Sequence, residues 1–398
     1  MLVPIIVGII LGILAGVLPG LHPNTISQII SSADYGSSFE IAALIVVSSA
    51  VNNIVALIPA IFFFIPDSDS VLSILPAQRL VKSGKGRLAV RTCAIAALLS
   101  LVFLVLVLPI SYISLPFLYD LAKPYIGHAL VLFSILFILQ ELPGGPGAVL
   151  KAAFVFGISG ALGFLLLSTP LSSAVNEPMF AAFIGFFALS SILLSFSEKS
   201  AIPHQHSSDK KTALSSSIVV IVFLSVLLGG IADILPAINS PAQLATFLSP
   251  IAGTSTAFLA ATTSITVSHY ANSLVAFDTI GKARTGTIVH ISELMGEFSD
   301  RDLLALVLFY FVGTGLGIIL FLLISELIIK IVNRIDQKAI NILILSFLLV
   351  SVGMVSGLLG LFVCGIATAM GLLPPMLGVR RTHLMAFLIV PSIALLLF

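Results

Sequence analysis

Long apolar runs separated by short polar or proline-rich connections follow one another along almost the whole chain. In the first half they lie at about 2–18, 39–65, 88–114, 124–141, 148–168 and 178–197. In the second half they lie at about 214–235, 246–273, 303–330, 339–353, 354–373 and 383–398. About 20 apolar residues in an α-helix cross the ~30 Å hydrocarbon core of a bilayer. We therefore predict an all-α integral membrane protein with ten to twelve transmembrane helices.

The amino-acid composition supports this fold class. Hydrophobic residues make up 59% of the chain and charged residues 9%, against roughly 25% charged residues in a soluble domain. The first apolar run lacks the basic segment of a secretory signal, so we predict a membrane helix there. The net charge of +1 gives no indication of nucleic-acid binding, and we expect no nucleic-acid partner. The expected location is the cell membrane, with the chain crossing it several times.

Three short motifs recur at one common offset and indicate an internal repeat. Gly84–Arg87 returns as Gly281–Arg284, which is 197 residues later, and two further pairs share that offset. These pairs are Ser159–Gly163 with Ser356–Gly360, and Pro178-Met179 with Pro375-Met376. A shared offset close to half the chain length predicts two homologous transmembrane repeats, at 1–198 and 213–398. The polar segment 199–212 is then the linker between them.

The orientation of the two repeats depends on how often each crosses the membrane. An odd number of crossings inverts the second repeat relative to the first, whereas an even number keeps both parallel. The distribution of Lys and Arg does not decide between five and six crossings, because both leave one side only moderately richer in basic residues. We prefer inverted repeats, since many transporters place their sites at broken helices between such repeats.

Proline and glycine interrupt the apolar pattern near the start of each half. The predicted helix breaks are at Pro19, Gly20, Pro23, Pro236 and Pro241. Such residues do not continue an α-helix, and the freed backbone groups of a broken helix can hold ions. Tight surface turns are the structural alternative. A functional break is favoured because polar residues follow at comparable places in both halves, namely Asn24, Thr25, Asn239 and Ser240.

Uncharged polar residues also lie inside two of the apolar runs. Asn52 and Asn53 interrupt the run at 39–65, and the run at 246–273 is rich in hydroxyl groups. Polar groups are costly in hydrocarbon and should face the protein interior or an aqueous cavity. Serine and threonine can instead bond to carbonyls of their own helix, but so many in one span favour a cavity lining. We predict substrate binding between the halves by Asn24, Thr25, Asn52, Asn53, Asn239, Ser240, Thr254, Ser255 and Thr256.

The basic residues of the repeated motif have two interpretations. Lys85, Arg87, Lys282 and Arg284 either anchor the chain at the level of the lipid headgroups, which is the more frequent role, or face a bound anion. Arg380 and Arg381, in the last connection, have the same two interpretations. Neutral donors remain the favoured substrate ligands, because they hold a carboxylate without burying an unpaired cation.

An enzyme is the less favoured class. Asp67 and Asp69 weakly resemble the Mg²⁺-diphosphate sites of intramembrane prenyltransferases, but those sites need a second acidic cluster, which the sequence lacks. His204 and His206 have no thiolate or carboxylate at metal-ligand spacing, and no serine lies in a nucleophile elbow. We predict no catalytic residues, no metal site and no cofactor. The favoured function is a secondary transporter of an organic anion. The alternative is a carrier or flippase of an anionic lipid such as polyprenyl phosphate.

Several of these segments together resemble one transporter family. Gly12–Pro23, Lys82–Val90 and Phe156–Gly163 resemble the large permease subunit of tripartite tricarboxylate transporters. The segment Leu373–Met385 is similar to the shorter archaeal branch of that family. The resemblance implies a permease that imports a small organic anion by symport, driven by a Na⁺ or H⁺ gradient. It also implies two partners, a small membrane subunit and an extracytoplasmic binding protein.

The chain departs from the bacterial pattern of that family at one place. In the first half, Asn52-Asn53 and Ile58–Ala60 occupy the region of the family's Gly-Gly-Ser-Thr substrate motif. In the second half, Gly253–Ala257 is closer in type to that motif. The resemblance therefore supports a transporter role more strongly than it supports a tricarboxylate as the substrate.

Overall fold

The computed structural model consists of helices and connections, and none of the residues that it describes lies in a β-strand. The structure describes residues 2–17, 26–27, 30, 36–63, 74–197, 205, 215–234, 244–245, 248, 251–283, 285–332 and 337–397. This confirms the predicted all-α fold class.

The first half of the chain forms nine α-helices within these described ranges. They are α1 (Leu2–Val17), α3 (Ser38–Val55), α4 (Leu57–Phe62), α5 (Ile74–Lys82), α6 (Gly86–Ala122), α7 (Ile126–Leu139), α8 (Pro146–Leu167), α9 (Pro178–Phe183) and α10 (Ser190–Ser197). A π-helical turn, η5 (Ile184–Leu189), joins α9 to α10. Shorter 3₁₀ turns are η2 (Lys123–Tyr125), η3 (Leu142–Gly144) and η4 (Pro170–Ser173).

The second half contributes α11 (Ser216–Ile231), α13 (Ser255–Ile280), α14 (Gly286–Met295), α15 (Asp300–Val332), α16 (Gln337–Leu377) and α17 (Ala386–Leu397). The 3₁₀ turn η6 (Ala232–Ile234) extends α11, and η7 (Arg381–Met385) precedes α17. Local sequence sets several of these ends. Ser37 and Glu40 form a capping box at α3, Ser215 and Thr254 cap α11 and α13, and Gly281 ends α13 in the left-handed conformation.

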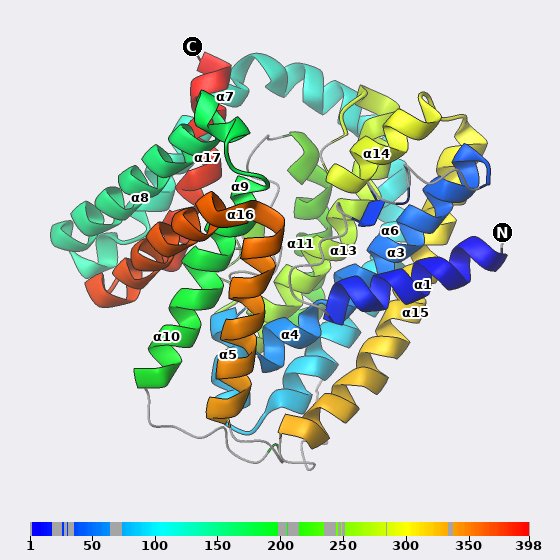
Figure 1. Ribbon diagram of the computed structural model, residues 1–398. Helices are drawn as coiled ribbons and strands as arrows, with labels where there is room; N and C mark the ends of the chain where they lie inside the picture. Colours follow the sequence, from blue (N-terminus) through cyan, green and yellow to red (C-terminus); the bar gives the residue numbers. More distant parts are fainter. Residues whose placement is uncertain are drawn as a thin grey trace.

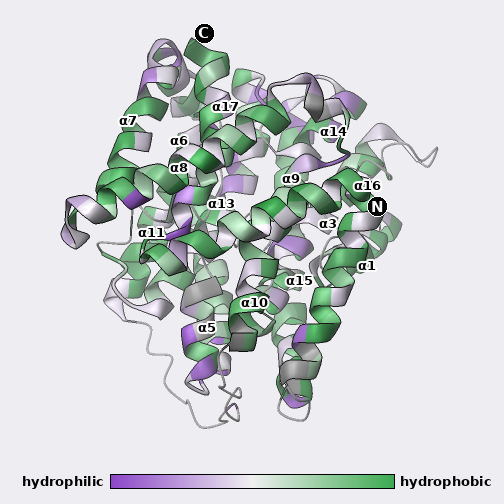
Figure 2. Cartoon of the chain, turned by 60° about the vertical axis from the view of Figure 1, so that its left-hand side comes forward, coloured by the Kyte–Doolittle hydropathy of each residue, from purple (hydrophilic) through white to green (hydrophobic). Residues whose placement is uncertain are grey.

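Six helical stretches in the described part of the chain are long and apolar enough to cross a membrane. They are Ser38–Phe62, Gly86–Gly144, Pro146–Leu167, Ser216–Ile234, Asp300–Ile331 and Asn341–Leu377. Three shorter apolar helices cover Leu2–Val17, Pro178–Leu194 and Arg381–Leu397. Large apolar side chains such as Ile113, Phe117 and Leu358 are exposed on the outside, and apolar residues cover much of the outer helices in Figure 2. A multi-pass membrane protein is thereby confirmed, while the predicted number of crossings stays a prediction.

The buried helix α13 lies at the centre of the molecule (Figure 1). It packs against α3, α6, α11 and α15, and most of its side chains from Ala257 to Ala276 are buried. This helix was expected at 246–273, but within the described residues it begins at Ser255 and continues to Ile280. Its hydroxyl groups make it too polar to count among the six apolar stretches, which is consistent with a helix surrounded by protein.

Glycines bring neighbouring helices close together along α1. A Cβ on Gly8, Gly12 or Gly16 would meet Val47, Val51 or Val55 of α3 in turn. Small residues four apart allow backbones to approach in this way. Because the contacts advance together along both helices, α1 and α3 pack parallel to each other.

Two further glycines lie at helix boundaries, one before α8 and one inside α16. Gly145 (φ 86°, ψ 173°) precedes α8, and Gly357 (φ 71°, ψ −170°) breaks α16 internally. This backbone region is essentially restricted to glycine. The predicted runs at 339–353 and 354–373 are therefore two helical segments that meet at Gly357.

The predicted linker contacts the first half at one described position. Gln205 is the only described residue of 199–212, and it is buried. Its side chain accepts a hydrogen bond from the backbone N of Gly86 (2.8 Å) and donates one to the carbonyl of Val81 (3.0 Å). The start of α6 is thus capped by a side chain from a distant segment.

Candidate functional site

Two tyrosines mark the contact between α13 and its neighbours. Tyr270 of α13 stacks on Tyr310 of α15, with ring centroids 5.0 Å apart and an interplanar angle of 13°. The Tyr310 hydroxyl donates a hydrogen bond to the carbonyl of Val267 (2.9 Å). It therefore ties α15 to the middle of α13.

The predicted site residues of α3 lie beside this tyrosine pair. Asn52 is buried, with 2% of its surface exposed. Asn53 faces the hydroxyl of Tyr310, and Ser49 faces the hydroxyl of Tyr270. Two polar residues from the first half thus meet two aromatic hydroxyls from the second half.

The predicted site residues of α13 lie at the beginning of that helix. Thr254 caps α13, because its Oγ1 accepts a hydrogen bond from the backbone N of Ala257 (3.2 Å) and lies 3.1 Å from the Oγ1 of Thr256. Thr254 is exposed, and Ser255 and Thr256 are half-buried. Eleven residues separate Thr256 from Val267, about 16 Å along a helix axis. The structure therefore does not bring Thr254–Thr256 together with Asn52 and Asn53.

The remaining predicted binding residues lie outside the described residues. They are Asn24, Thr25, Asn239 and Ser240, together with the helix breaks Pro19, Gly20, Pro23, Pro236 and Pro241 and the basic residue Arg284. Helix α1 ends at Val17 and η6 ends at Ile234, just before these segments.

Many hydroxyl groups of α13 bond within the helix. Thr262, Thr266, Ser268 and Thr279 each donate to a carbonyl three or four residues earlier. This is the structural alternative to a cavity lining, and it satisfies these groups without solvent. These four hydroxyls are therefore satisfied within the helix, and the cavity lining expected from the hydroxyl-rich run stays a prediction.

The described residues of the repeated basic motif, Lys85, Arg87 and Lys282, lie near the ends of helices. Arg87 forms a two-point ion pair with Glu326 of α15, with Nη2–Oε2 at 2.7 Å and Nε–Oε1 at 3.1 Å. Lys85 and Lys282 are both exposed. Helices α6 and α13 pack parallel, because Cys93 faces Thr263 and Tyr112 lies beside Asp278. Lys85 precedes the start of α6 and Lys282 follows the end of α13. The two lysines therefore lie at opposite ends of the helical body. Figure 1 shows the neighbouring helices α5 and α14 at opposite ends as well.

A buried acidic group was missed by sequence reasoning. Asp233, in η6, is fully buried, and its Oδ1 accepts a hydrogen bond from the Oγ of Ser273 (2.5 Å). The Nε2 of His269 lies 3.4 Å from the same oxygen. A carboxylate near the end of an apolar run is a recognisable signal for function. Ser273 and His269 lie on another helix, and no local pattern links them to Asp233.

A second polar cluster joins the α7–α8 turn to the segment after α16. The Oε1 of Glu141 accepts from the backbone N of Arg380 (3.0 Å) and lies 3.2 Å from the Nε2 of His383. Arg380 also donates from Nη1 to the Oε1 of Gln140 (2.8 Å). Burial lowers the pKa of Arg381, in the segment after α16, to about 10.

Comparison with known families identifies the class of protein. The family model described as "Tripartite tricarboxylate transporter TctA family" matches residues 2–386. No curated protein and no solved structure matches the chain. The matched family is a family of transporters and not of enzymes.

Proposed function

The chain belongs to the tripartite tricarboxylate transporter TctA family, and from this premise we propose that it is a secondary active permease for a small organic anion, a carboxylate, driven by an ion gradient. Family membership makes the chain a permease component of a transporter. The observation that carries the proposal is the polar and aromatic contact around α13, enclosed by helices with apolar outer faces. We carry three features over from the family to this chain as part of the proposal. They are the driving ion gradient, the carboxylate substrate and the two accessory partners.

We further propose that the two halves are inverted repeats, and the directions of helix packing support this. In the pair α3 and α15, Phe39 packs on Phe309, and a Cβ on Gly317 would meet Ile54. In the pair α6 and α13, Cys93 faces Thr263 and Tyr112 lies beside Asp278. Both pairs are parallel, as expected if α3 corresponds to α13 and α15 corresponds to α6.

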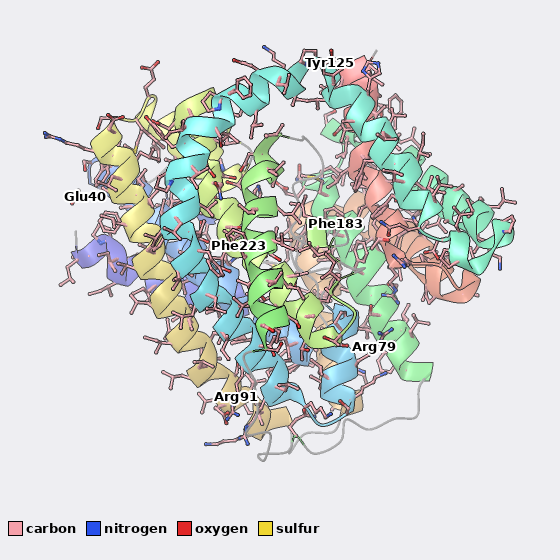
Figure 3. All side chains as sticks on the ribbon, turned by 180° about the vertical axis from the view of Figure 1, so that it is seen from behind. Glu40, Arg79, Arg91, Tyr125, Phe183 and Phe223 are labelled. Carbon is pink, nitrogen blue, oxygen red and sulfur yellow. The ribbon has the colours of Figure 1, made fainter. Side chains whose placement is uncertain are left out.

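The orientation of α6 against α15 supports the inversion. Arg87, in the first turn of α6, pairs with Glu326 near the end of α15. Tyr112, further along α6, lies beside Asp300 at the start of α15. The two corresponding helices are therefore antiparallel, and Figure 3 shows Arg91 and Tyr125 toward opposite ends of the molecule, with α6 between them.

Glycine conformations suggest which residues correspond. Gly84 and Gly296 both have positive φ, and each follows a short helix and precedes a long one. Gly145 and Gly357 share the glycine-specific conformation at the helix breaks. Both pairs are 212 residues apart, which favours this register over the offset of 197 residues read from the motifs. The repeats then still coincide with 1–198 and 213–398.

Crossed packing between the halves also supports two related units. Helix α8 packs on α17 where Gly163 approaches Phe387, and α16 packs on η5 where Gly371 approaches Phe186. Each contact joins one helix from the first half to one from the second. The same type of close approach, a glycine against the backbone of a phenylalanine, thus occurs twice with the roles of the halves exchanged.

The substrate contacts are proposed at two levels of one route. Asn52 and Asn53 are positioned to hold a carboxylate in the interior with neutral donors, which avoids burying an unpaired cation. Thr254–Thr256, about 16 Å away along α13, are positioned where the positive end of the helix dipole attracts an anion. Lys85 and Lys282 are exposed, which favours their role as anchors at the lipid headgroups.

Uptake into proteoliposomes tests the proposed function. We expect [¹⁴C]citrate or [¹⁴C]succinate to accumulate in vesicles that contain the protein, under an imposed pH or Na⁺ gradient, and not in empty vesicles. If neither probe moves under either gradient, the proposal fails. Chemical accessibility of a fluorescently labelled polyprenyl phosphate headgroup then tests the lipid-carrier alternative in the same vesicles.

A further inference from the structure

A polar cluster is buried between α6, α11 and α13. It consists of Asp233, His269, Asn272, Ser273 and Ser111. Asp233, Asn272 and Ser273 are fully buried, and His269 is 5% exposed. A Cβ built on Gly230 would lie 3.3 Å from the Oδ1 of Asn272 and 3.4 Å from the Oγ of Ser111, so both side chains lie against α11 at this glycine. The cluster is thus assembled from three helices and not from one.

Two consecutive glycines explain how the carboxylate reaches α13. A Cβ on Gly229 would overlap the Oγ of Ser268 and lie 2.9 Å from the backbone N of His269. Only glycine permits α11 to approach α13 this closely. One turn later, Asp233 meets Ser273 and His269 at the distances given above. The close approach of α11 to α13 therefore brings the Asp233 side chain into contact with α13.

A purely structural role would not require an ionisable pair at this place. Placing a charge in the interior is unfavourable by several kcal/mol per ion, whereas an amide at position 233 could accept the same hydrogen bond from Ser273. The cluster also contains one hydrogen-bond acceptor, the Oδ1 of Asn272, that its internal hydrogen bonds do not use. The Nδ2 of Asn272 donates to the carbonyl of Ser268, but its buried Oδ1 has no hydrogen-bond partner in the described part of the chain.

Among the described residues, few titratable groups lie around the cluster. Helix α11 has none between Ser216 and Ile231. On α6, Tyr119 packs beside Ile234, the residue after Asp233. On α13, Tyr270 stacks on Tyr310 of α15, and Asp278 lies beyond Ser273 toward the end of the helix. Within the part of the chain that the structure describes, the imidazole of His269 lies nearest to the Asp233 carboxyl, 3.4 Å from its Oδ1.

We propose that Asp233 and His269 form a proton-binding site, and that its protonation couples a proton gradient to transport. This proposal rests on the proposed permease function and names its coupling ion. One H⁺ from one side of the membrane binds the Asp233–His269 pair and one H⁺ leaves to the other side, with no electrons transferred. A conformational equilibrium shifts when its two states differ in proton affinity.

Two variants with a matched control test this site by transport. Asp233→Asn and His269→Gln remove the titrating groups at nearly constant volume, while Asp120→Asn removes an exposed carboxylate on α6. In proteoliposomes loaded with a pH-sensitive dye, we expect Asp233→Asn to lose most proton influx and at least tenfold of the pH-driven accumulation of [¹⁴C]citrate or [¹⁴C]succinate. Counterflow exchange of the same probe should persist, and Asp120→Asn should behave as the wild type. Equal pH-driven accumulation in wild type and Asp233→Asn overturns the proposal.

A titration that needs no substrate keeps the proposal testable if a variant transports poorly. In the purified full-length protein, infrared difference spectra against pH should show the carbonyl band of a protonated carboxyl that Asp233→Asn removes and Asp233→Glu restores. His269→Gln should shift its pH midpoint. If no band depends on Asp233, the proton site is refuted. Loss of Na⁺-driven uptake alone in Asp233→Asn likewise refutes it, in favour of a Na⁺ site. If wild type moves neither probe, it is the proposed permease function that fails, whatever the infrared titration shows.

Discussion

Arg87 and Glu326 form a two-point ion pair that joins the first turn of α6 to the final part of α15. Arg87 is about one fifth exposed and Glu326 about half exposed. The pair gives Arg87 a partner within the protein. It also fixes the antiparallel orientation of two helices that we propose to be equivalent.

Breaking this pair is expected to have a modest effect on stability and none on substrate affinity. Exposed ion pairs contribute about 0.2–1 kcal/mol, so Arg87→Gln should lower the Tm slightly and leave the apparent KM of uptake unchanged. The double exchange Arg87→Glu with Glu326→Arg should recover most of the lost stability. Arg301→Gln, at an exposed position of α15, is the control. A raised apparent KM in normally inserted Arg87→Gln protein would instead support an anion-facing arginine.

The inverted arrangement predicts labelling from opposite sides of the membrane. We expect Ser83→Cys and Lys282→Cys, in a background without Cys93 and Cys364, to react with a membrane-impermeant maleimide from opposite faces. Lys282 is a better position than Gly281, because Gly281 has φ +65° and a side chain there would strain the backbone. Labelling of both cysteines from the same side of sealed, oriented vesicles would exclude inversion.

The helix break at Gly357 predicts a substitution cost that comes from the backbone alone. A Cβ at Gly357 would meet no atom within 4 Å, so Gly357→Ala is unfavourable only through its positive φ, on the order of 1–3 kcal/mol. Gly365→Ala is the matched control, because Gly365 lies in the same helix with equal space around it but without positive φ. That control should be stabilising by about 0.5–1 kcal/mol. Thermal unfolding followed by a thiol-reactive dye measures both, since Cys93 and Cys364 are free and buried. Equal Tm changes of the same sign in both variants would contradict the assigned break.

The fold class could be predicted from the sequence because hydrophobic length is a local property. The run at 148–168 became α8 (Pro146–Leu167), and the run at 214–235 became α11 with η6. Boundaries were less accurate where polarity did not mark the end of a helix. Helix α6 continues to Ala122, past the expected end at 114, because Pro109 and Pro116 are tolerated inside it.

The candidate site could be predicted only in part, because its contacts are not local. The burial of Asn52 follows from an amide inside an apolar run, and this is visible in the sequence. The contact of Asn53 with Tyr310, or of Asp233 with His269, depends on which helices pack together. The motif offset of 197 residues stays a prediction, and local sequence did not reveal that Gly84 follows the short helix α5 whereas Gly281 follows the long helix α13.

The proposed substrate contacts at the start of α13 can be tested separately from the capping of that helix. Thr254→Ala removes the cap of α13, which typically costs about 1 kcal/mol, so a loss of uptake in that variant alone would not identify a binding residue. Thr254→Ser keeps both the cap and the hydroxyl, and Thr256→Val removes a hydroxyl without touching the bond to Ala257. If the hydroxyls bind substrate, Thr256→Val should raise the apparent KM several-fold at an unchanged Tm, and Thr254→Ser should resemble the wild type.

The interior contacts are tested in the same assay. Asn52→Ala should lower the maximal uptake rate or raise the apparent KM by several-fold in inserted protein, because it removes a buried donor without removing much apolar packing. Ser100→Ala is its control, since Ser100 is also buried but its hydroxyl is already bonded to the carbonyl of Ala96 within its own helix. If Asn52→Ala and Thr256→Val both leave rate and affinity unchanged while Asp233→Asn abolishes pH-driven uptake, the substrate lies elsewhere than at these two levels of α13. The carboxylate site would then have to be sought on helices other than α3 and the start of α13.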